Sequence, residues 1–144
     1  MSPRQFFHYV SYLQYPILLA ATYFYIPFIR GMANREWLSD SLENTLVLMG
    51  LALSMSSLQD TTKTQNKLSR KIWESPKGGR IFLIYMSLLT FTFIFAGIGF
   101  MFLPEDNRLN EISVGITVLG VGVLGLLKPA IEMYENHRKD KNPK

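Results

Sequence analysis

The stretch Ile81–Leu103 contains 23 consecutive residues without a formal charge. A helix rises about 1.5 Å per residue, so about 20 apolar residues cross the hydrocarbon core of a bilayer. A run of this length predicts a transmembrane helix rather than the core of a soluble domain. Pro104 and the acidic residues that follow it end the run.

Two further segments meet the same criterion. Residues 6–29 form a run of 24 residues without a charge when His8 is neutral, and residues 112–131 are rich in glycine and valine. Lys128 lies near the far end of the second segment, where its long stem reaches the headgroups. The first run is too long for a cleavable signal peptide, and we expect it to be retained.

A fourth segment, residues 38–58, is shorter and more polar. Its uninterrupted apolar part covers only residues 45–58, a length that also suits a re-entrant segment. Asp40 is expected to be the N-cap of a helix, and Glu43, three residues later, to complete a capping box. We expect this segment to cross the membrane where its neighbours shield it from lipid.

The distribution of basic residues predicts the orientation of the chain. Four crossings place the N-terminus, the connection 59–80 and the tail 132–144 on one side, together with 12 of the 15 Lys and Arg residues, Lys128 included. The other side carries Arg30, Arg35 and Arg108. Basic residues near span ends are retained in the cytoplasm. The sequence therefore predicts an all-α, four-helix transmembrane bundle in the plasma (inner) membrane, with both termini cytoplasmic.

The basic connection 59–80 is expected to form an amphipathic helix on the inner leaflet. Trp73 would lie at the interface, with the surrounding cations over anionic headgroups. Pro76–Gly79 is expected to break the chain before the next span. A simpler interpretation is that these cations only set the orientation. The residues predicted to contact anionic lipid are Lys63, Lys67, Arg70, Lys71, Trp73, Lys77 and Arg80.

Polar groups within the spans are the first candidates for a transport or binding site. Glu43 and Asn44 lie in the second span and Gln14 in the first. Pro16 is expected to kink the first span, because proline removes a backbone hydrogen bond and crowds the preceding turn. The alternative roles are the capping box for Glu43 and a tolerated kink for Pro16.

Three glycines of the last span, Gly115, Gly122 and Gly125, lie close to one helical face. Glycine lets helix backbones approach each other closely in lipid. This face predicts a packing seam, either within the bundle or between protomers.

The composition excludes several kinds of chemistry. The chain has no cysteine, which excludes disulfides, thiolate metal sites, iron–sulfur clusters and cysteine nucleophiles. Its two histidines, His8 and His137, lie near the chain ends and cannot form a bis-histidine haem site at membrane depth. We therefore predict no cofactor, no metal and no catalytic centre. The basic residues flank apolar segments, so headgroups rather than nucleic acid are the expected partner.

Two functional hypotheses follow. The first is a small non-enzymatic membrane protein that acts as an accessory or scaffold subunit, as a homo-oligomer or in a larger membrane complex. The alternative is an oligomeric channel or small-solute transporter that uses the kinked first span and Glu43.

Overall fold

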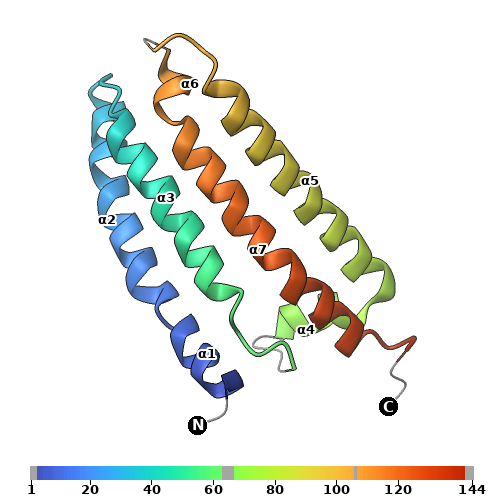
Figure 1. Ribbon diagram of the computed structural model, residues 1–144. Helices are drawn as coiled ribbons and strands as arrows, with labels where there is room; N and C mark the ends of the chain where they lie inside the picture. Colours follow the sequence, from blue (N-terminus) through green and yellow to red (C-terminus); the bar gives the residue numbers. More distant parts are fainter. Residues whose placement is uncertain (1–2, 63–66, 106, 142–144) are drawn as a thin grey trace.

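The computed structural model describes residues 3–62, 67–105 and 107–141, and these residues form an all-helical chain (Figure 1). Four long helices lie side by side in the order α2 (Gln14–Ala33), α3 (Ser39–Ser56), α7 (Ser113–His137) and α5 (Pro76–Phe100). The main contacts join neighbours in this row. The expected four-helix bundle is therefore not confirmed, because the helices form a single layer and do not close into a bundle.

Three short helices lie at the two ends of the long helices. They are α1 (Pro3–Ser11), α4 (Lys67–Glu74) and α6 (Arg108–Glu111). Both ends of the chain lie at the same end of the row as α4 (Figure 1). We call this the basic end, formed by α4, the first turns of α5 and residues 128–141. The opposite end is formed by residues 30–40 and 101–112.

Three helical segments are long and apolar enough to cross a membrane. They are Gln5–Ala33, which combines α1 and α2, together with α5 and α7. The 18-residue α3 is not among them, and it contains Asp40, Glu43 and Asn44 in its first two turns. The chain thus has the helices of a membrane protein, with three candidate spans.

The first candidate span is interrupted near its start. The helix breaks at Tyr12 and Leu13, and Pro16 lies in the first turn of α2. The Pro16 ring would crowd the carbonyl of Tyr12, four residues earlier, in a continuous helix. The Tyr12 carbonyl instead accepts a bond from the Tyr15 backbone N–H at 3.1 Å. Proline thus starts a new helix here, where its missing N–H is not needed.

The start of α3 differs from the expected capping box. The helix begins at Ser39 with Leu38 as its N-cap residue, and no side chain caps it. Asp40 therefore lies inside the first turn, where its negative charge interacts favourably with the positive end of the helix dipole. The capping-box prediction was wrong because the helix begins two residues earlier, with Leu38 and not Asp40 as the N-cap residue.

Glycines of α7 set the spacing between the long helices. A Cβ added at Gly122 would lie 2.4 Å from the carbonyl oxygen of Gly50 in α3, and one at Gly115 would lie 3.0 Å from the oxygen of Glu43. On the other side of α7, a Cβ at Gly120 would lie 2.9 Å from Ile94 of α5. Gly125 makes only ordinary contacts, with Ser54 and Ser57. Gly115 and Gly122 thus face α3 of the same chain and allow the two backbones to touch.

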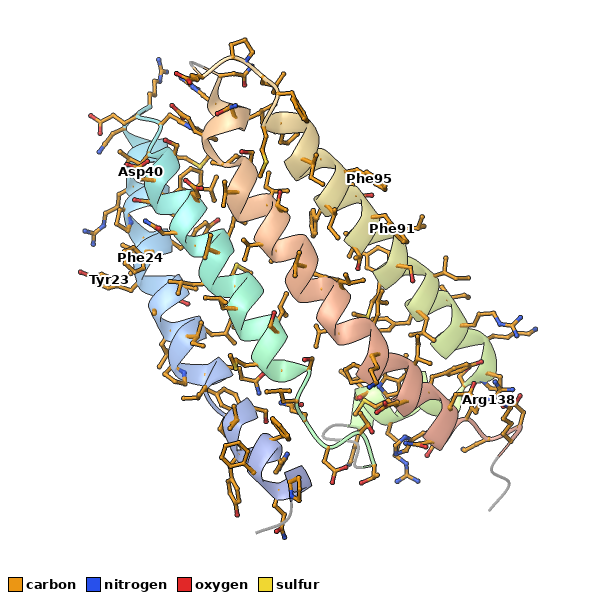
Figure 2. The ribbon with its side chains drawn as sticks, viewed as in Figure 1. Tyr23, Phe24, Asp40, Phe91, Phe95 and Arg138 are labelled. Carbon is orange, nitrogen blue, oxygen red and sulfur yellow. The ribbon has the colours of Figure 1, made fainter. Side chains whose placement is uncertain are left out.

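The helix α2 packs on α3 through small side chains. Ala21 and Ala52 are buried, and the buried Thr45 hydroxyl lies 3.5 Å from the carbonyl of Ala21. Tyr23 lies on the other side of α2 and points away from the row (Figure 2). The tyrosines of the first span are all exposed, whereas Phe28 near the end of α2 is buried.

Candidate functional site

At the basic end, α4 packs against α5 and α7. Trp73 is only 6% exposed and packs with Ala130 and Tyr134. Its ring meets Phe82 edge to face, with centroids 5.3 Å apart, and its Nε1–H donates to the Ser69 hydroxyl at 3.0 Å. Trp73 therefore anchors α4 to the protein. The prediction that it contacts lipid was wrong, because the ring is enclosed by α5 and α7.

Tyr134 connects α7 to the start of α5. Its hydroxyl donates to the carbonyl of Pro76 at 2.8 Å, and its ring packs closely against Gly79. A Cβ at Gly79 would lie 2.3 Å from Cδ2 of that ring, so glycine is required there. Pro76 and Gly79 therefore belong to the first turn of α5 and do not break the chain.

The sequence gives a physical reason for this earlier helix start. Ser75 has an extended backbone, and its hydroxyl accepts the Gly78 N–H at 3.1 Å. Proline is favoured in the first helical position because its ring already has the helical φ angle. A serine N-cap followed by proline thus starts α5 five residues before the apolar run begins.

Ion pairs tie the C-terminal tail to α4. Glu74 pairs with Arg70 on its own helix and with Lys139 of the tail, at 2.9 Å to Lys139. The Lys139 backbone N–H also donates to the Glu74 carbonyl at 3.2 Å. The bonds from Arg70 and Lys139 lower the pKa of the Glu74 carboxyl from 4.5 to about 2. Glu74 therefore keeps its charge, and its part in this connection, through the physiological pH range.

Arg138 orders the end of α7 (Figure 2). Its guanidinium forms two bonds to the Asp140 carboxylate, at 2.8 and 2.6 Å, and a third to Glu135 at 3.1 Å. It also lies over the Tyr134 ring, 5.2 Å from the centroid. Arg138 is thus occupied within the protein, whereas Lys67 and Lys71 form no ion pair within the described residues.

Of the residues predicted to contact anionic lipid, five are exposed at the basic end: Lys67, Arg70, Lys71, Lys77 and Arg80. Lys63 lies outside the described residues. A shallow pocket of about 410 Å³ is lined by Lys67, Arg70, Lys71, Glu74, Ser75, Pro76 and Lys139. A second, partly open and mainly apolar pocket of about 210 Å³ lies between the end of α3 and helices α4, α5 and α7. The basic end thus combines a cationic surface with a small buried cluster formed by Trp73, Ala130 and Tyr134.

The four residues of the predicted transport site do not come together. Gln14 and Pro16 lie at the start of α2, toward the basic end, whereas Glu43 and Asn44 lie near the start of α3 (Figure 1). Figure 2 places Asp40, one turn before Asn44, at the opposite end. Gln14 is buried, Glu43 is half-buried, and Asn44 and Pro16 are exposed. The antiparallel arrangement of α2 and α3 therefore separates the two pairs along most of the length of a helix.

The opposite end is closed by contacts that the sequence did not indicate. Arg108 lies over the Trp37 ring at 5.3 Å, and Trp37 meets Phe28 edge to face. The Asn110 side-chain amide donates to three carbonyls at the end of α5 and just after it, including that of Leu103 at 2.9 Å. These contacts join the loop before α3 to the loop before α7. Their role is to hold these segments in place.

Comparisons with protein-family models, with curated proteins and with solved structures found no match. Within the described part of the chain, no group of three or more His, Asp or Glu residues is placed to hold a metal ion.

Proposed function

We propose that this protein crosses the membrane four times and acts as a non-enzymatic accessory or scaffold subunit, packed with its own copies or in a larger membrane complex. The single-row arrangement of the long helices carries this proposal. Even the central helices α3 and α7 expose large apolar side chains, among them Leu51, Val121 and Leu124. A row has two broad faces available for other helices, and it encloses no path of its own through the membrane.

The packing of α3 supports a fourth crossing. It lies between α2 and α7, two candidate spans, and contacts both along its length (Figure 1). Its backbone touches that of α7 at Gly50, while Thr45 faces α2. A helix held on both sides by spanning helices shares their depth, and its polar first turns then lie near the headgroups. Asn44 remains exposed there and can donate to a neighbouring helix.

The basic end supports a cytoplasmic placement of both termini. The exposed cations of α4 and of the start of α5 lie on the same side as the tail, whereas Arg30, Arg35 and Arg108 lie at the opposite end. Cytoplasmic retention of Lys and Arg favours the basic end inside. The anionic inner leaflet is then the nearest partner for Lys67 and Lys71.

Single cysteines test the topology, since the natural chain has none. We expect Asn34→Cys and Glu105→Cys to react with a membrane-impermeant maleimide in intact cells. Thr62→Cys and Lys141→Cys should react only after the membrane is opened. Equal labelling of positions 34 and 62 from one side would show that α3 does not cross.

The scaffold function is tested by the mass of the protein after mild detergent extraction and by flux in proteoliposomes. We expect a complex larger than one chain, and no proton or organic-cation flux above that of protein-free vesicles. Flux that falls in Glu43→Gln but not in Glu105→Gln, a matched change in an exposed loop, would instead establish the transporter. A monomer without partners would contradict the scaffold.

A further inference from the structure

An apolar groove runs along the junction of α5 and α7, beginning at the basic end. Its volume is about 380 Å³, within the range of small-molecule sites. Its apolar walls are formed by Leu83, Ile84, Leu88 and Phe91 of α5 and by Leu127 and Ile131 of α7. Both helices are candidate spans, so the groove lies at the depth of lipid acyl chains.

The hydroxyl of Ser87, within the groove, does not require a polar ligand. Ser87 lies among the apolar residues, but its hydroxyl donates to the Leu83 carbonyl at 2.9 Å. A serine bonded within its own helix presents mainly its carbon atoms to a ligand. The wall is therefore suited to a hydrocarbon chain.

Arg80 lies at one end of this groove and is the only charged residue among those that line it. It is exposed and takes part in none of the ion pairs formed by the described residues. A guanidinium without a carboxylate partner matches the geometry of a phosphate and bonds to it through two N–H groups. An anion bound at this end would thus neutralise the charge of Arg80.

The length of the groove matches one leaflet. From Arg80 to Phe91 a helix rises roughly 16 Å, and half of a hydrocarbon core is about 15 Å thick. An occupant with a phosphate at Arg80 therefore has room for an acyl chain that ends near the middle of the bilayer, where Phe91 stacks with Phe95 at 6.2 Å.

We propose that this groove binds one phospholipid, with its phosphate on Arg80 and one acyl chain between α5 and α7. The inference goes beyond the scaffold function and does not depend on it, since it requires only that α5 and α7 lie in the bilayer. It also gives Arg80 a role distinct from that of the cations on α4, which lie outside the groove.

The experiment is native mass spectrometry of the full-length protein, delipidated in detergent and titrated with dioleoyl phosphatidylglycerol. We expect one saturable lipid adduct, weakened about fivefold or more in Arg80→Gln, the effect of losing one cation from an anionic headgroup. Lys128→Gln is the matched control, because Lys128 neighbours the groove residue Leu127 but does not line the groove. It should leave the adduct unchanged.

Two further measurements keep the proposal testable if Arg80→Gln fails to fold. Dihexanoyl phosphatidylglycerol has the same headgroup but short chains, and we expect it to bind the natural protein much more weakly than the dioleoyl lipid. Inorganic phosphate should not compete. Equal binding of the two lipids, competition by phosphate, or equal losses in Arg80→Gln and Lys128→Gln would overturn the proposal.

Discussion

Replacing Gly122 with alanine is expected to separate α3 from α7 and to destabilise the protein by about 1–3 kcal/mol. The added methyl would lie 2.4 Å from the Gly50 carbonyl oxygen and 2.8 Å from its Cα. These are backbone atoms, so no rotamer change relieves the clash, and one helix must move. Within the described residues, α2 contacts the other long helices mainly through α3, so a displacement of α3 also disturbs the position of α2.

Gly125→Ala is the matched control, since the same methyl on the same helix would meet its nearest atoms at 3.9–4.0 Å. We expect it to be neutral or slightly stabilising, because alanine favours the helix over glycine. Unfolding in detergent, followed by circular dichroism, measures both variants. Equal stability of the two would show that the close approach of α3 and α7 does not hold the row together.

Replacing Trp73 with alanine is expected to release α4 from the protein. Truncating a buried aromatic side chain costs about 3–5 kcal/mol, and an isolated helix of eight residues is not stable in water. The exposed ion pairs of Glu74 contribute little each and cannot replace the lost packing. We expect trypsin to cleave at Arg70 and Lys71 much faster in the variant, with hydrogen exchange increased across residues 67–74.

Leu68→Ala is the control for Trp73, because Leu68 is on the same helix but 77% exposed. Its cleavage rate should equal that of the natural protein. Unchanged protection in Trp73→Ala would mean that the ion pairs of the tail, and not the tryptophan, hold α4 in place.

The structure of the basic end was only partly predictable from its residues. The short helix and its cations follow from local sequence, since the spacing of Leu68, Ile72 and Trp73 indicates one helical face. Which of the three is buried does not follow from spacing, because it depends on where α5 and α7 lie. The bond between Tyr134 and Pro76 joins residues 58 positions apart and had no local signal. Pro76–Gly79 is predicted from the sequence to break the chain, but with Ser75 as N-cap these residues form the first turn of α5.

For the polar residues and glycines of the spans too, the sequence predicts local features, whereas the contacts depend on the tertiary structure. Glu43, Asn44, Gln14 and Pro16 were grouped because each is unusual within an apolar segment, but their distance apart depends on the direction in which α2 and α3 run. The spacing of Gly115, Gly122 and Gly125 predicts one shared helical face, but it leaves the partner of that face open. Only the packed helices identify it as α3 of the same chain.

By itself, the sequence determined that this chain contains helices long and apolar enough to span a membrane. The reason is that the length of a charge-free run, compared with the thickness of a bilayer, is a local property of the chain. The tertiary structure alone decided that the helices form a row, that Trp73 is buried and that Arg80 lies at the end of an apolar groove. These features depend on how closely distant backbones approach each other, and apolar residues that are equally soluble in lipid do not specify this.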